Sequence, residues 1–116
     1  MSISSTIEHL PNNKAVITVN GSLTLGTSLK VLDSQIQNLI DGGLRHLVLE
    51  LSGVDYADSA GLGLLVHAYG RLSEKQGTVT LTGVRPRVLE LICMTKVDTF
   101  FAFEQRSGGS PLPAES

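Results

Sequence analysis

The sequence predicts an α/β fold, with a small mixed β-sheet that is antiparallel at its first strand, otherwise parallel, and flanked by helices. Two observations support this prediction. Two kinds of stretch alternate along the chain. Short runs that are apolar, or in which apolar and polar residues alternate, are typical of strands, and longer stretches have apolar residues every three or four positions, as on a helix. The first two strands are joined by a short turn, which suits antiparallel neighbours, whereas helices separate the later strands and suit parallel ones.

The predicted sheet begins with two strands joined by a turn. A weak strand is predicted over residues 2–9, and a stronger one follows at 15–19, where apolar positions alternate. Residues 11–13, Pro-Asn-Asn, form the turn, because proline presets its φ angle and asparagine tolerates left-handed conformations. Residues 20–26 then connect the second strand to a helix.

The first helix is predicted from Thr27, with an apolar face made of Leu29, Leu32, Ile36, Leu39 and Ile40. We expect Thr27 or Ser28 to cap its start and the pair Gly42-Gly43 to end it. The next strand, 46–51, is almost wholly apolar, as is typical of a strand buried on both faces.

A second helix is predicted over about 60–75, ending before Gly77. A strand at Thr78–Thr82 alternates valine and leucine with threonine, and a third, shorter helix begins at Pro86, a residue suited to the first helical position. The last apolar group predicts either a short final strand or an aromatic plug under the sheet, and consists of Phe100, Phe101 and Phe103.

Length and composition predict one domain over residues 1–104 and a disordered tail over 105–116, which has too little apolar surface to fold. The nine basic residues are scattered and the net charge is −2, so we expect no direct binding to nucleic acid. We also expect no membrane contact and a cytoplasmic location, because no apolar run approaches the roughly 20 residues of a membrane span and the N-terminus lacks signal-peptide features. The single cysteine, Cys93, lies in an apolar helical stretch and is predicted to fill the core.

We predict that the chain is not an enzyme and that it uses no cofactor. The histidines His9, His46 and His67 fall on three different elements and lack metal-ligand spacing. The glycines that follow Ser59 have neither the Lys-Ser/Thr of a P-loop nor a full Gly-x-Gly-x-x-Gly, which disfavours a nucleotide-binding module. Ser59 as a nucleophile would need a base, and His67 lies two helical turns away.

Ser59 therefore has two interpretations. Asp58 or Ser59 could simply cap the helix, since both residue types are preferred there. Alternatively, Ser59 accepts a phosphoryl group, which would add a charge of about −1.5 to −2 at the helix N-terminus. Asp55 and Asp58 would repel that charge, so the change would act as a switch on a partner bound at this loop. Gly61 and Gly63 are expected to let the helix approach the sheet closely.

Residues 58–63, Asp-Ser-Ala-Gly-Leu-Gly, follow a buried strand and an acidic loop. This stretch resembles the signature of bacterial anti-sigma factor antagonists in the STAS domain family. The resemblance extends from the first strand to about Glu104, and includes residues 21–23, 45–49 and 77–81. It implies a mixed sheet flanked by helices and no catalytic activity.

The resemblance also implies partner switching. The unphosphorylated protein would bind an anti-sigma factor that is also a serine kinase, and would so regulate transcription indirectly. Phosphorylation at Ser59 would release the kinase, and a phosphatase would reverse the mark. The partner-binding residues carried over in this way are Thr24, Asp55, Asp58, Ser59, Ala60 and Gly61.

Thr24 departs from the family pattern, because many members have an aspartate there. Threonine keeps a hydroxyl but lacks the charge, and it could equally be a helix-flanking residue. The alternative function is a structural STAS subunit of a larger signalling or lipid-transport complex that is never phosphorylated. The exposed first strand could also pair with a copy of itself in a weak homodimer.

Overall fold

The computed structural model describes residues 3–104, so the tail predicted over 105–116 lies outside the described residues. The elements follow one another as β1 (Ser4–Leu10), β2 (Lys14–Asn20), α1 (Thr27–Asp41), β3 (His46–Gly53), α2 (Ser59–Ser73), β4 (Thr78–Thr82), α3 (Pro86–Met94), the 3₁₀ helix η1 (Asp98–Phe100) and β5 (Ala102–Glu104). This order confirms the predicted alternation, including the short last strand.

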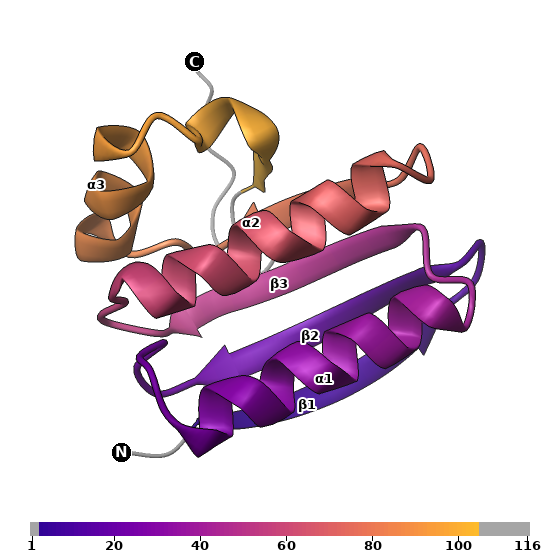
Figure 1. The fold of residues 1–116 in the computed structure, drawn as a ribbon, viewed down its shortest axis with the longest axis horizontal. Coiled ribbons are helices and arrows are strands. Elements are labelled where there is room, and N and C mark those ends of the chain that lie inside the picture. Colours follow the sequence, from indigo (N-terminus) through magenta and orange to yellow (C-terminus); the bar gives the residue numbers. More distant parts are fainter. Residues whose placement is uncertain (1–2, 105–116) are drawn as a thin grey trace.

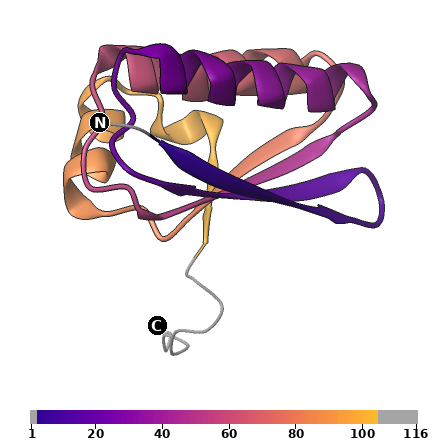
Figure 2. The ribbon, with the colours of Figure 1, turned by 90° about the horizontal axis from the view of Figure 1, so that it is seen from below.

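The sheet has the strand order β1-β2-β3-β4-β5, so each strand lies beside its neighbour in the sequence. The β1 and β2 strands are antiparallel, and every other pair is parallel. In one row across the parallel strands, Lys14 pairs with His46 and His46 with Thr78. Because the crossovers from β2 to β3 and from β3 to β4 run in the same direction and are right-handed, α1 and α2 cover the same face of the sheet (Figure 2). The α3 and η1 helices lie beyond α2, away from α1 (Figure 1).

The core lies between the sheet and these two helices. Every second residue of β2, β3 and β4 points toward the helices and is buried, namely Ala15, Ile17, Val19, Leu47, Leu49, Leu51, Val79 and Leu81. The helices bury Leu29, Leu32, Ile36 and Ile40 from α1 and Leu64, Leu65, Ala68 and Leu72 from α2. The predicted apolar face of α1 is therefore correct, although Leu39 is only partly buried.

Two turns show how local sequence sets the chain path. Asn12 and Asn13 both have positive φ angles, of 68° and 60°, as a tight hairpin between β1 and β2 requires. After α2, by contrast, Gln76 takes the left-handed conformation, with φ of 62°. Gly77 is needed for a different reason, because a Cβ there would lie 2.1 Å from the carbonyl oxygen of Arg45.

Two local predictions are wrong. The α1 helix begins after Gly26 with no side-chain cap, so neither Thr27 nor Ser28 caps it. Cys93 is exposed rather than in the core. The reason is the orientation of α3, which turns Val88 and Ile92 inward and the residue next to Ile92 outward.

Both predictions for the last apolar group hold in part. Phe103 lies in β5, whereas Phe100 and Phe101 pack against Tyr69 of α2, with Tyr69 and Phe100 stacked at a centroid distance of 4.5 Å. The aromatic cluster thus packs on α2. Across the described part of the chain, the helices are too short for a bilayer crossing.

Candidate functional site

Ser59 is the first residue of α2, and it is exposed just beyond the carboxyl end of β3. The residue that caps the helix is Asp58, whose Oδ1 atom accepts hydrogen bonds from the backbone N–H groups of Ala60 at 2.9 Å and Gly61 at 3.0 Å. The Ser59 hydroxyl makes no hydrogen bond with the described residues. The cap interpretation therefore applies to Asp58 and leaves the Ser59 hydroxyl available for other chemistry.

The other carboxylate oxygen of Asp58 ties a second loop to α2. Its Oδ2 atom accepts from the N–H of Leu25, in the connection between β2 and α1, at 3.1 Å. Hydrogen bonds to Gly61 first, and then to Leu25, hold the pKa of Asp58 below its ordinary value, because they favour the ionised form. Asp58 is thus a fixed negative charge directly beside Ser59.

The two loops also join through their backbones. Leu23 forms a parallel bridge with Ala57, its N–H donates to the carbonyl of Tyr56, and its carbonyl accepts from the N–H of Asp58. Gly61 is required by this junction, because a Cβ there would lie 2.1 Å from the Leu23 carbonyl oxygen. The connection after β2 and the N-terminus of α2 therefore form one continuous surface.

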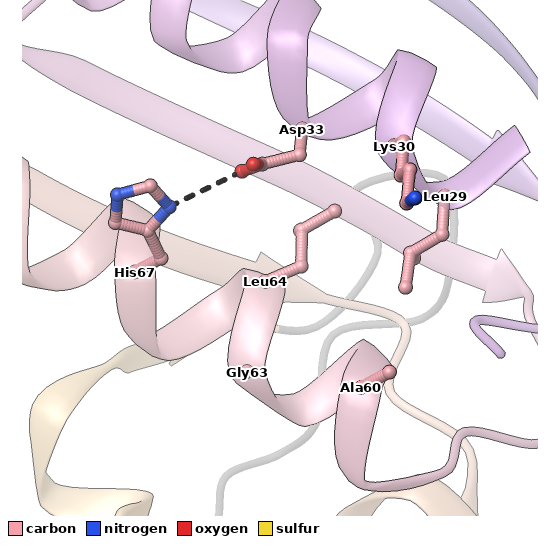
Figure 3. Close-up of a pocket in the computed structure, with 7 residues that line it drawn as sticks. All are labelled: Leu29, Lys30, Asp33, Ala60, Gly63, Leu64 and His67. Carbon is pink, nitrogen blue, oxygen red and sulfur yellow. Dashed lines mark ion pairs between the residues drawn. The ribbon is translucent and has the colours of Figure 1, made fainter. Parts of the chain in front are cut away.

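Gly63 does not have the role predicted for it. A Cβ at this position would have nothing within 4 Å, so close packing does not require a glycine. It lies instead on the exposed side of α2, in a groove of about 240 Å³ between α1 and α2 (Figure 3).

The structure brings the predicted partner-binding residues together at this end of the sheet. Thr24 lies between Leu23 and Leu25, both of which are bonded to residues 56–58. Asp55 is exposed and accepts a long hydrogen bond, of 3.4 Å, from the hydroxyl of Ser22. That they bind a partner remains a prediction.

One side of α3 lies beside Ser59, which was not predicted from the sequence. Arg87 of α3 places its guanidinium carbon 5.1 Å from the centre of the Tyr56 ring. A hollow of about 380 Å³ lies here, lined by Tyr56, Ala57, Asp58, Ser59, Arg87, Glu90, Leu91 and Met94. The residue spacing in the sequence does not indicate that α3 packs here. The available signal was the presence of apolar residues, such as Tyr56, near the 58–63 signature.

These apolar residues are unusually exposed for their type. Leu25 is 74% exposed, Met94 72% and Tyr56 43%, and they come from three different segments around Ser59. Exposed apolar side chains that gather on one face are typical of a surface that contacts another protein.

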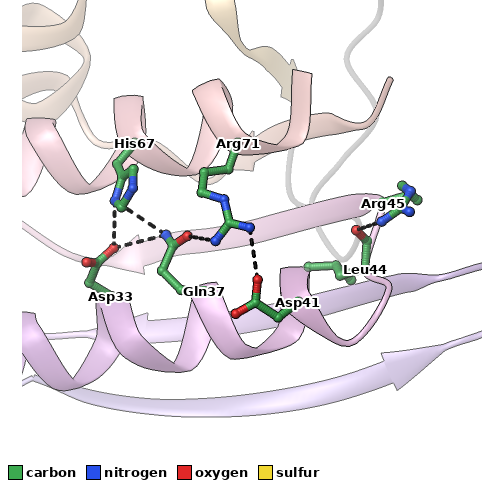
Figure 4. A network of polar contacts seen from close by, with 7 residues as sticks. All are labelled: Asp33, Gln37, Asp41, Leu44, Arg45, His67 and Arg71. Carbon is green, nitrogen blue, oxygen red and sulfur yellow. Dashed lines mark hydrogen bonds and ion pairs between the residues drawn. The ribbon is translucent and has the colours of Figure 1, made fainter. Parts of the chain in front are cut away.

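The histidine nearest to Ser59 in the sequence belongs to a separate network between α1 and α2 (Figure 4). His67 Nδ1 lies 3.4 Å from Asp33 Oδ1, and Gln37 donates to the same oxygen. Arg71 donates to Gln37 at 2.8 Å and to Asp41 at 2.9 Å. The network ties the two helices together. Within residues 3–104, no three histidine, cysteine, aspartate or glutamate side chains gather as metal ligands would.

Comparison with known proteins adds the family. The STAS domain model matches residues 4–108. The putative anti-sigma factor antagonist BtrV of Bordetella bronchiseptica is 33% identical over 60 residues, and this match spans 52% of each chain, about half the length of BtrV. The anti-sigma-B factor antagonist of Listeria monocytogenes is 28% identical over 108 residues, covering 93% of this chain and 94% of the relative.

Solved structures agree with the fold. The anti-sigma factor antagonist SpoIIAA in its unphosphorylated form has a TM-score of 0.78 at 17% identity, covering 90% of this chain and 91% of that one. The Bacillus cell fate determinant SpoIIAA in its phosphorylated form has a TM-score of 0.74 at 15% identity, covering 90% and 95%. With the family match over nearly the whole described chain, the protein belongs to the STAS domain family.

Proposed function

We propose that this protein is a non-enzymatic anti-sigma factor antagonist that works by partner switching in the bacterial cytoplasm. In its unphosphorylated form it binds an anti-sigma factor that is also a serine kinase. Phosphorylation of Ser59 breaks this complex, and a phosphatase restores it. The observation that carries the proposal is an exposed serine hydroxyl, without a capping role, that lines a hollow together with the exposed side chains of Tyr56 and Met94.

The relatives support this choice among the functions open to the fold. Two curated relatives are named as anti-sigma factor antagonists, one of them only putatively. SpoIIAA, which shares the fold, is described in both unphosphorylated and phosphorylated forms. A phosphoacceptor role for Ser59 would give the same two states to this chain.

Phosphoryl transfer to Ser59 requires little from this chain, because the kinase holds the ATP and supplies the base. The Ser59 Oγ attacks the γ-phosphorus of an ATP molecule held by the kinase, the bond between that phosphorus and the bridging oxygen breaks, and ADP leaves. The hydroxyl proton passes to a base of the kinase. Ser59 must only be reachable, and its exposure at the first position of α2 meets that need.

Electrostatics explain why the phosphate would end the complex. The N-terminus of α2 accommodates a negative charge, so the fold should not change. Asp58 is already held ionised beside Ser59, and Asp55 is exposed nearby. Adding about −1.5 to −2 charge here makes the surface strongly negative, so a partner would meet repulsion and a larger desolvation cost. Because Thr24 carries no charge, the unphosphorylated surface is less negative than one with an aspartate at this position.

Intact-mass spectrometry tests the proposal. The protein is incubated with ATP and each candidate serine kinase from its own genome, alongside Ser59→Ala and Ser73→Ala. Ser73 is a matched control, because it is an exposed serine at the other end of the same helix. We expect one added phosphate in the wild type and in Ser73→Ala, and none in Ser59→Ala.

A binding measurement with the kinase found in this way completes the test. Ser59→Asp should bind that kinase at least about tenfold more weakly than Ser59→Ala. If no candidate kinase adds a phosphate, or if both variants bind equally well, the switch is wrong, and a structural STAS subunit becomes the better hypothesis.

A further inference from the structure

The hollow beside Ser59 contains a cation whose role the proposed function leaves open. Arg87 and Ser59 line the same space of about 380 Å³, although 28 positions of sequence separate them. The guanidinium group rests over the ring of Tyr56, which precedes Ser59 by one short stretch of loop. The position of α3 thus brings an arginine to the serine without any local sequence signal.

Arg87 is not committed to another charge. No carboxylate of the described residues lies within ion-pair distance of it. Two acidic residues share the hollow. Both carboxylate oxygens of Asp58 already accept backbone hydrogen bonds, and Glu90 lies one turn along α3 from Arg87. Among the described residues, the cation is held only by the face of the exposed Tyr56 ring, an interaction that is weak at the protein surface.

A phosphoserine would offer Arg87 a stronger partner. A phosphate has three acceptor oxygens, and the planar guanidinium fork can bind two of them in parallel. Hydrogen bonds between two charged groups are shorter and stronger than the contact of a cation with a ring. Among the described residues that line the hollow, Arg87 is the only cation.

We propose that Arg87 binds the phosphoryl group of phosphorylated Ser59 within the same molecule and leaves the Tyr56 ring to do so. This inference rests on the proposed function, because it concerns the phosphorylated state of the same serine. Phosphorylation then changes the surface in two ways besides adding the phosphate charge. Arg87 is no longer available to a partner, and the hollow beside Met94 and Tyr56 is filled. A partner that uses this hollow is excluded sterically as well as by repulsion.

The test needs no kinase, because phosphoserine can be incorporated at position 59 during translation. The phosphorus NMR signal of this residue is followed against pH in the wild type, in Arg87→Gln and in Arg85→Gln. Arg85 is the matched control: it is an exposed arginine two positions away, and its guanidinium bonds the carbonyl of Ser52 instead. Loss of a bound cation disfavours the dianion, so Arg87→Gln should move the titration midpoint up by about 0.5 pH unit or more.

The Arg85→Gln control measures how far the titration midpoint moves when a nearby positive charge that does not bind the phosphate is removed. Arg85→Gln should move the midpoint by less than half as much, and 1 M NaCl should bring the wild-type midpoint toward that of Arg87→Gln. Equal midpoints in the wild type and Arg87→Gln, or equal shifts in the two variants, would overturn the proposal.

A second readout covers the case in which a variant folds poorly. In protein labelled with ¹⁵N-arginine, the side-chain Nε signal of Arg87 should shift when Ser59 is phosphorylated, and an unmoved signal would also overturn the proposal. The two proposals fail in different ways. If the proposed function is wrong, no kinase modifies Ser59, but the NMR experiment on the translationally incorporated phosphoserine still gives a result.

Discussion

Asp58 holds the candidate site together, and its removal gives the sharpest test of the geometry. One carboxylate caps α2 through Ala60 and Gly61, and also ties the loop before α1 to that helix through Leu25. We therefore expect Asp58→Ala to destabilise the protein and to loosen the two loops from each other. The partner variant Asp58→Asn separates these effects, because asparagine caps helices as well as aspartate does.

The expected size follows from these contacts. Loss of an N-cap costs about 1 kcal/mol, and loss of the bond to Leu25 costs about 1 kcal/mol more. Asp58→Ala should therefore lower the free energy of unfolding by about 2 kcal/mol, or the Tm by about 8 °C for a domain of this size. In Asp58→Asn the side-chain oxygen can still cap, but its nitrogen cannot accept from Leu25, so about half of that loss remains.

The pH dependence has a definite sign. The pKa of Asp58 is lowered in the folded state, so its ionised form stabilises the fold above the unfolded-state pKa, which is about 3.9. That stabilisation is lost as the pH falls through the lowered folded-state pKa. The wild type should therefore exceed Asp58→Asn in stability at pH 7, and the difference should shrink below about pH 4.

Urea unfolding followed by circular dichroism, at pH 7 and at pH 3, measures these differences. Asp55→Asn is the matched control, because Asp55 is exposed and has one long hydrogen bond, and it should change stability by less than about 0.5 kcal/mol. A loss below about 0.5 kcal/mol in Asp58→Ala, or a difference between the wild type and Asp58→Asn that does not shrink at pH 3, would refute the assignment of both contacts.

Three further predictions concern stability and are checked by thermal unfolding. Gly61→Ala should cost about 2 kcal/mol or more, because the new Cβ would lie 2.1 Å from the Leu23 carbonyl oxygen. Gly63→Ala should instead stabilise α2 by up to about 1 kcal/mol, because its Cβ would have no atom within 4 Å. Equal effects of the two substitutions would contradict the packing described for α2. Phe101→Ala should cost about 3 kcal/mol, because the side chain is buried against the aromatic cluster, and a cost under 1 kcal/mol would place it elsewhere. Arg71→Met should cost less than about 1 kcal/mol, with a loss that becomes smaller in high salt, because salt screens the ion pair with exposed Asp41 but not the hydrogen bond to Gln37.

The order of elements and the place of Ser59 could be predicted because both depend on local patterns. Strand and helix periodicities alternate clearly, and the signature after a buried strand places a serine at a helix start in any α/β sheet of this kind. The charge of Asp58 beside Ser59 was predicted, but its capping role was only one of two options. The structure decides between them, because the hydrogen-bond geometry of two adjacent polar residues cannot be read from residue type.

Other features depend on how distant segments pack. Gly61 and Gly63 look alike in the sequence, yet only the first faces the loop at Leu23, because the rotation of α2 about its axis decides which one is crowded. Arg87 and Met94 could not be assigned to the site, because their approach depends on how α3 packs beside the loop before α2 rather than on any spacing. Cys93 was misplaced for the same reason.

The strand order has a consequence for how the chain folds. Because each strand pairs with the one before it in the sequence, no strand has to be inserted between two that are already paired. The β1–β2 hairpin can form within microseconds, whereas a ribosome needs seconds to deliver the following crossover at about 5–20 residues per second. An isolated hairpin is only marginally stable, so the first durable intermediate should need α1 and β3 as well. The equal spacing of the Lys14, His46 and Thr78 pairings makes the second crossover a repeat of the first. Synthesis from the N-terminus therefore matches the direction in which the sheet grows, and α3 completes the hollow beside Ser59 only after β3 is already in place.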